Sequence, residues 1–214
     1  MASEMLDHIL AGFDTSSITL TFLAWEISRT ENQEWQTKLR QEIAGLEDKH
    51  DAKAIDNLPG LHAIVMETLR LHAAIPGNQP RITPPSAMLG APGHDISDLP
   101  AGVRVQSQAW SLHRNPEVFP EPESWKPERW LAASEAEHRE MNRWFWAFGS
   151  GGRMCVGSNL ALYDMKAIIV AIWGRFKTEV AFDEGMVHRG GYVAEPVGVD
   201  GRFLELKVEE ISSS

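Results

Sequence analysis

Ten of the twelve prolines fall within residues 73–130, and this distribution limits what the chain can fold into. Proline fixes φ and lacks a backbone N–H, so it interrupts helix interiors and is confined to the edges of sheets. The stretch is therefore incompatible with long helices and with strands at the centre of a sheet. One short strand is predicted after the turn at 100–102, where Val103 and Val105 alternate with polar residues.

The sequence on either side of this stretch has helical periodicity. Apolar residues recur at spacings of three and four, the pattern of a helix that buries one face. The predicted helices cover residues 5–28, 35–46, 59–72, 134–143 and 158–175. The turn sequence Asp200-Gly201 lies between short runs of strand-like sequence, and in the second run apolar and charged residues alternate. This pattern predicts a β-hairpin near the C-terminus. The predicted fold class is mainly α, of the α+β type, with small peripheral β-hairpins.

Composition excludes several classes of protein. The 214 residues include 30 acidic and 20 basic side chains, a net charge of −10, which argues against a dedicated nucleic-acid binder. The single cysteine, Cys155, excludes an intramolecular disulfide, a CxxCH haem attachment and a zinc knuckle. The longest apolar run, 167–173, is too short for a transmembrane segment, and residues 1–7 lack the features of a signal peptide.

Four glycines surround Cys155 in the segment 148–157, immediately before the apolar helix. Glycine allows positive φ and lets backbone approach a flat ligand, and a helix N-terminus lowers the pKa of a thiol. These properties suit a thiolate that faces an electrophile or a metal. Two other interpretations stay open at this point: a free cysteine beside a helix cap, and a nucleophile with a histidine base, for which His138 is nearest in sequence.

The segment resembles the FxxGxRxCxG signature of the cytochrome P450 superfamily, the haem-thiolate monooxygenases. Phe148, Gly151, Arg153, Cys155 and Gly157 fill all five fixed positions. The resemblance implies that these residues bind haem b, with the Cys155 thiolate as the axial ligand of the iron. It further implies that Arg153 contacts a haem propionate and that Phe148 packs near the sulfur. The overall character of the sequence, rather than any one motif, is similar to eukaryotic, fungal-type members.

Two further motifs agree with this resemblance. Glu67 and Arg70 form an ExxR, whose residues share one face of a helix. Pro127-Glu128-Arg129-Trp130 resembles the family's PERF segment, with Trp130 in place of the commoner phenylalanine. The resemblance implies that Glu67, Arg70 and Arg129 form a buried structural charge cluster that supports the haem loop.

The first predicted helix contains Ala11-Gly12-Phe13-Asp14-Thr15, which is similar to the family's AGxDT. The resemblance implies that this helix crosses the distal haem face, opens locally there, and uses Asp14 and Thr15 as a catalytic proton relay. Arg81 occupies the region where the family often places a second propionate-binding arginine. His113 is interpreted as a packing or capping residue rather than an iron ligand.

The resemblance covers nearly all of residues 1–214 but only the C-terminal half of a family domain, so the chain is expected to be a partial domain with apolar faces exposed. Monooxygenation of a small organic substrate, with electrons from NADPH through a flavoprotein reductase, is the implied reaction. Residues 126–177 carry a local charge of +3, which favours docking of an acidic reductase. Family members of this type are usually anchored to the endoplasmic reticulum membrane.

Two other functions remain open at this stage. The chain could be a non-catalytic remnant that binds haem weakly or not at all. It could also be a Cys155-dependent hydrolase or transferase, which would require a reactive thiol without haem.

Overall fold

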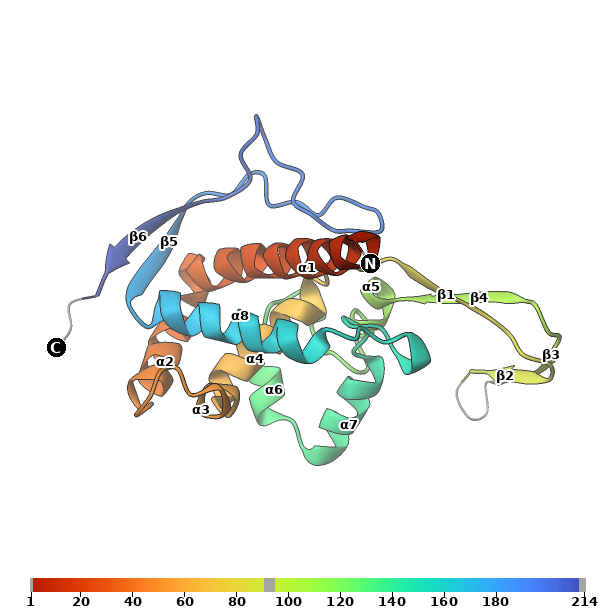
Figure 1. Cartoon of the computed structure of the whole chain (residues 1–214). Coiled ribbons are helices and arrows are strands. Elements are labelled where there is room, and N and C mark those ends of the chain that lie inside the picture. The colour runs from red at the N-terminus through yellow and green to blue at the C-terminus, as the bar shows by residue number, and fades with distance from the viewer. Residues whose placement is uncertain (1, 91–94, 212–214) are drawn as a thin grey trace.

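The longest element is α1 (Ala2–Ser28), which crosses the molecule beside α8 (Ser158–Trp173) (Figure 1). The computed structural model describes residues 2–90 and 95–211. Most residues of α1 after Ser17 are buried or half-buried, whereas those from 3 to 14 are exposed. Only the C-terminal part of this helix therefore belongs to the core.

The helices predicted on either side of the proline-rich stretch are confirmed as α1, α2 (Gln33–Ala44), α4 (Pro59–Leu71), α7 (Glu135–Trp144) and α8. The sequence did not predict the short helices α3 (Ala52–Asp56), α5 (Ala109–Leu112) and α6 (Glu128–Ala132), or the 3-10 turns η1 (Thr30–Asn32) and η2 (Gly151–Arg153). Pro59 starts α4, where its missing N–H costs nothing. Ser134 and Glu137 form a reciprocal capping box that starts α7.

The main core surrounds α4, which packs against α1, α2 and α8. Every residue of α4 from Gly60 to Leu71 except His62 is buried. Leu23 of α1, Ile64 of α4 and Ile169 of α8 meet in this core, each without exposed surface. Because α4 carries Glu67 and Arg70, both charges lie inside the protein.

The described strands form three two-stranded antiparallel sheets, and the proline-rich stretch holds four short strands where the sequence predicted only the one after residues 100–102. They pair β1 (Asn78–Ile82) with β4 (Arg104–Gln108), β2 (Ala87–Leu89) with β3 (Ile96–Leu99), and β5 (Phe176–Phe182) with β6 (Glu205–Glu210). The first two pairs project from the helices (Figure 1). Every strand lies at an edge, so Pro80 in β1 interrupts no central strand.

The predicted hairpin around Asp200-Gly201 is wrong in its pairing. At this turn only an isolated bridge joins Val199 and Arg202, and β6 pairs instead with β5, which directly follows α8. The 183–204 segment, which connects β5 and β6, passes over α1 (Figure 1). Alternation in the sequence identified β6 as a strand, but its partner is set by the packing of β5 against α1 and α8.

Apolar surface is exposed on the N-terminal part of α1, as expected. Leu6, Ile9, Leu10 and Phe13 retain between 55% and 68% of their accessible surface. The total accessible surface is 12892 Å², whereas a globular monomer of this mass exposes about 9,900 Å². None of the helices in the described ranges combines the length and apolar character needed to cross a bilayer.

Candidate active site

A cavity of about 340 Å³ opens between α1, the end of α4, β1 and the loop before α8. Five residues singled out from the sequence line it, namely Thr15, Arg81, Phe148, Arg153 and Cys155. The apolar lining residues include Leu69, Ala74, Ile75, Ala147, Ala161 and Met165. The cavity therefore brings a thiol, two guanidinium groups and a hydroxyl together on largely apolar walls.

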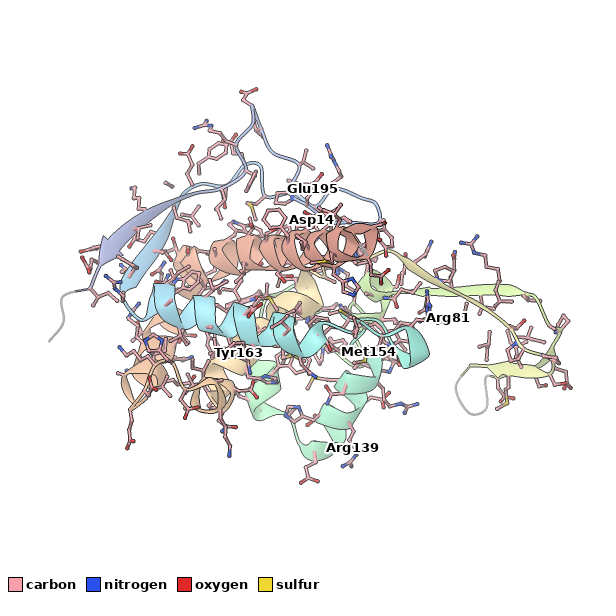
Figure 2. The ribbon with its side chains drawn as sticks, viewed as in Figure 1. Asp14, Arg81, Arg139, Met154, Tyr163 and Glu195 are labelled. Atoms are coloured by element: carbon pink, nitrogen blue, oxygen red, sulfur yellow. The ribbon has the colours of Figure 1, made fainter. Side chains whose placement is uncertain are left out.

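Backbone hydrogen bonds within the loop before α8 present Cys155 to this cavity. The N–H of Cys155 donates to the carbonyl of Phe148 at 2.8 Å, and the N–H of Met154 donates to that of Gly151 at 3.0 Å. The Cys155 side chain is exposed. Figure 2 shows Met154 in this loop, at the N-terminal end of α8. The fold of the loop thus leaves the thiol accessible from the cavity.

Two glycines in the loop adopt backbone conformations that other residues rarely tolerate. Gly149 has φ of +72° and Gly151 has φ of +69°. A Cβ on Gly149 would also lie 3.0 Å from Oε1 of Gln79. Gly157, the N-cap of α8, has φ of −90°. Gly151 and Gly157 shape the loop without lining the cavity themselves.

Both arginines predicted to contact propionates border the cavity. Figure 2 labels Arg81, which belongs to β1. Its Nη2 donates to the carbonyl of Ser150 at 3.0 Å, and this bond joins β1 to the loop before α8. Arg153 lies in η2 and is exposed. Guanidinium groups offer paired donors that match a carboxylate, so this wall of the cavity can bind an anionic group.

The two residues predicted to relay protons are placed differently. Thr15 lines the cavity and its Oγ1 donates to the carbonyl of Ala11 at 2.7 Å, while Asp14 is exposed and is not among the lining residues. The local helix opening implied by the resemblance is absent, since α1 is continuous and the threonine hydroxyl bonds back within it. Ser16 and Thr19 also line the cavity, which the sequence did not indicate.

Glu67, Arg70 and Arg129 are in direct contact inside the protein. Nη2 and Nε of Arg70 donate to the two carboxylate oxygens of Glu67 at 2.8 and 2.9 Å, and Nε of Arg129 donates to Oε1 at 3.0 Å. Arg70 also donates to the carbonyls of His113, Pro122 and Ser124. This arginine therefore ties the proline-rich stretch to α4.

Glu67 remains ionised in this setting. Burial by itself would raise the pKa of Glu67, but the hydrogen bond and charge of Arg70 lower it, as do the charge of Arg129 and the N–H of Lys126. The net result is a pKa below the usual value. Nε1 of Trp130 donates to Oε2 at 2.9 Å, so the tryptophan found in place of phenylalanine adds a contact to this carboxylate.

His113 connects α4 to the segment that leads into the cysteine loop. Its Nδ1 lies 2.7 Å from the carbonyl of Arg70, and its Nε2 accepts from the N–H of Trp146 at 2.7 Å. The proton must therefore sit on Nδ1. Burial lowers the pKa of His113 to about 3, which keeps the ring neutral. The residue packs and bridges, as interpreted from the sequence.

Part of the local positive charge in residues 126–177 is internal. Lys166 retains 2% of its side-chain surface and pairs with Asp56, and Arg129 is bound to Glu67. Arg139 and Arg143 of α7 are exposed. The formal charge of this region thus overstates the positive charge on its surface.

Comparison with known proteins identifies the family. The family model described as Cytochrome P450 matches residues 1–188. The chain belongs to the cytochrome P450 family. It is 34% identical over 89% of its length to cytochrome P450 monooxygenase tazI of Aspergillus terreus, covering 38% of that protein. It is 37% identical over 74% of its length to cytochrome P450 monooxygenase stcB of Emericella nidulans, covering 29% of that protein.

A third relative is cytochrome P450 monooxygenase cloA of Claviceps purpurea. It is 30% identical over 81% of this chain, and the match covers 33% of that protein. The chain thus spans about a third of the length of these curated relatives. These P450 relatives come from fungi, in agreement with the resemblance read from the sequence. The histidine that a Cys155 hydrolase would require is not among the described residues that line the cavity.

Proposed function

We propose that this chain provides the haem-thiolate site of a cytochrome P450 monooxygenase, with Cys155 as the axial ligand of haem b. The observation that carries the proposal is the position of Cys155 on the same cavity as Arg81 and Arg153. A thiolate suits haem iron, and guanidinium groups suit the propionates. Apolar walls such as Phe148 and Met165 suit the porphyrin ring. The residues present therefore fit this cofactor.

When bound, haem would supply the activation of dioxygen for insertion of one oxygen atom into an organic substrate. The role of the protein's own residues is binding and proton supply. Gly149 and Gly151 hold the loop in a shape that exposes the Cys155 sulfur. The hydroxyl of Thr15 stands on the cavity wall, where it can orient water and pass a proton at Oγ1. Asp14, one residue earlier on exposed helix surface, would exchange that proton with solvent.

The electrons for this reaction would come from NADPH through a flavoprotein reductase. Exposed basic groups of the 126–177 region that could meet an acidic partner include Arg139 and Arg143 of α7, which also pair with Glu135 and Glu140, and Arg175 after α8. As for family members of this type, the proposed location is the endoplasmic reticulum membrane. The substrate is proposed only as a small organic molecule.

The test is the spectrum of the purified chain after addition of hemin, reduction and exposure to carbon monoxide. We expect the strongly red-shifted Soret band of thiolate-ligated ferrous haem, and its loss in Cys155→Ala. The matched control is Ser16→Ala, which alters another lining residue and keeps the thiol. A thiolate-type band in Cys155→Ala would refute the ligand assignment. Absence of any haem uptake by the wild-type chain would favour a non-catalytic remnant. Rapid alkylation of Cys155 together with absence of haem uptake would favour a hydrolase or transferase.

A further inference from the structure

Three titratable side chains outside the cavity form a continuous hydrogen-bonded chain that links α1, the end of α4 and the 183–204 segment. Nε2 of His72, at the end of α4, lies 2.7 Å from Oε1 of Glu26 in α1. Nδ1 of the same ring lies 2.7 Å from Nε2 of His188. The side chains of Glu26 and His72 retain only 2% and 7% of their accessible surface. The proposed haem site uses none of the three.

The partners determine where the protons lie in this chain. Oε2 of Glu26 also accepts from Arg29 at 3.1 Å and from Asn32 at 3.3 Å, so the carboxylate acts only as an acceptor. His72 must then carry its proton on Nε2, which leaves Nδ1 to accept from Nε2–H of His188. Both rings are neutral in this arrangement, and every hydrogen bond runs toward Glu26.

Aromatic packing holds both imidazoles in position. The ring of Phe22, which is fully buried, stacks on His72 at 4.5 Å with an interplanar angle of 4° and lies 4.4 Å from the ring of His188. Trp25 contacts His72 edge-on at 5.8 Å. The apolar surroundings penalise a charged ring. Burial lowers the pKa of His72 despite the opposing effect of Glu26. Burial, together with repulsion from His72 in its protonated form, lowers the pKa of His188 to about 4.

His188 stands at the base of a loop whose middle reaches the cavity. The N–H of Val197 donates to the carbonyl of Val187 at 2.9 Å, and a bridge pairs His188 with Pro196. Tyr192, halfway along this loop, lines the cavity. Beyond it, the N–H of Ala194 donates to the carbonyl of Ala74 at 2.9 Å. The position of the His188 ring thus fixes the base of a loop that forms one cavity wall.

We propose that His72 and His188 are positioning residues that latch the 187–197 loop, and with it Tyr192, onto the cavity wall while both rings are neutral, and that protonation releases the loop. Protonation of His188 alone leaves its Nε2–H donating to Nδ1 of His72 but places a charge in apolar surroundings, so it favours the released loop. If both rings were protonated, Nδ1–H of His72 would also face Nε2–H of His188, and the hydrogen bond between the rings would be lost.

The charged groups around the rings set the direction of the pH response. They are Glu26 and Arg29 at the end of α1, Arg70 in α4, Arg114 after α5, and Asp183, which accepts from Trp25. Arg114 opposes protonation of both histidines, and Glu26 favours protonation of His72. In the latched state the pKa of His188 is depressed, so the latch is complete above about pH 6.5 and weakens as the pH falls toward about 4.

Hydrogen exchange at the Ala194 amide measures latching directly, because that N–H is bonded across to Ala74. Exchange is compared at about pH 7.5 and about pH 5 after correction for the intrinsic rate, without haem. If His188 alone titrates, protection at Ala194 falls by about 25-fold between these conditions. The amide of Ile169 in the core helix α8 reports the change in global stability over the same pH interval, and the loss of protection at Ala194 is measured relative to it.

Variants of His188 distinguish an effect of ring protonation on the loop from an effect of ring packing alone. His188→Gln can still donate to His72 but does not titrate, so protection at Ala194 should stay high and lose most of its pH response. His188→Ala should lower protection at both pH values. The control His50→Gln, in an exposed turn, should keep the full response of the wild-type chain. Protection at Ala194 that is independent of pH in the wild-type chain, or an undiminished response in His188→Gln, would overturn the proposal. Neither result depends on haem binding.

Discussion

Nε1 of Trp130 donates a hydrogen bond of 2.9 Å to Oε2 of Glu67, a carboxylate with no exposed surface. The same oxygen accepts from Nε of Arg70, and Oε1 accepts from Arg70, Arg129 and the N–H of Lys126. The carboxylate is thus surrounded by five donors from α4 and the 126–130 segment. A phenylalanine at position 130 would supply the ring but not the donor.

Trp130→Phe should therefore destabilise the chain by about 1–2 kcal/mol, the cost of removing a hydrogen bond to a buried charge. The measurement is the free energy of unfolding in urea. Trp144→Phe is the matched control, since Nε1 of Trp144 donates at 2.8 Å to Glu140, whose side chain is 46% exposed. Water can replace that bond, so the control should change stability by less than about 0.5 kcal/mol. Equal effects in the two variants would contradict the role assigned to Trp130.

Arg70→Lys should be far more damaging, although it preserves charge. Arg70 donates to Glu67 and to three backbone carbonyls, and a lysine ammonium has neither the reach nor the planar geometry for all of them. We expect a loss of about 3–5 kcal/mol, because buried acceptors are left without partners. Thermal unfolding monitored by circular dichroism measures this loss.

Arg143→Lys provides the comparison for Arg70→Lys. Arg143 pairs with Glu140 on the surface of α7, where its side chain is 72% exposed. Exchange of arginine for lysine there should alter stability by no more than about 0.5 kcal/mol. A small effect at position 70 as well would mean that the buried cluster contributes little to the fold.

The sequence predicted a large part of this arrangement. The i, i+3 spacing of Glu67 and Arg70 places them on one face of a helix, and the glycines around Cys155 indicate a loop with positive φ. Proline density correctly predicted the short elements between residues 73 and 130. These features depend on local chain geometry, which short motifs encode.

Features that depend on distant packing were not predictable in this way. Tyr192 reaches the cavity because its loop is attached to Ala74, far away in the sequence. The partner of β6 is β5 rather than the residues before Asp200. The bond between Trp130 and Glu67 likewise depends on how the proline-rich stretch folds over α4. No periodicity or motif in a single sequence specifies such contacts.

His113 should stay neutral over most of the acidic range. Burial depresses its pKa in the folded state to about 3, below the unfolded value of about 6.5. Its contribution to stability is thus complete above about pH 6.5 and is lost as the pH falls toward about 3. Between about pH 6.5 and about pH 4 the loss should reach about 3 kcal/mol.

The test compares the pH dependence of unfolding free energy in the wild-type chain and in His113→Gln. Glutamine does not titrate, so the variant should show a smaller loss on acidification even if it is less stable at neutral pH. Ring nitrogen chemical shifts of His113 provide a direct readout of its protonation. A ring that gains its second proton near pH 6 while the chain remains folded would contradict the bridge between Arg70 and Trp146.

The two glycines at positions 149 and 152 offer a matched pair within the cysteine loop. Gly149 has φ of +72° and an added Cβ would lie 3.0 Å from Gln79, whereas Gly152 has open space around the corresponding position. Gly149→Ala should cost about 1–2 kcal/mol because alanine is strained at positive φ. Gly152→Ala should leave stability within about 0.5 kcal/mol of the wild-type value.

The same pair tests whether the shape of the loop controls the exposure of the thiol. Cys155 N–H bonds to the carbonyl of Phe148, next to Gly149, so strain at position 149 should disturb that bond. Reaction of Cys155 with a neutral disulfide reagent should change by several-fold in Gly149→Ala and remain unchanged in Gly152→Ala. If both variants react like the wild-type chain while Gly149→Ala is destabilised, the glycine is needed for folding and the exposed thiol does not depend on the backbone at position 149.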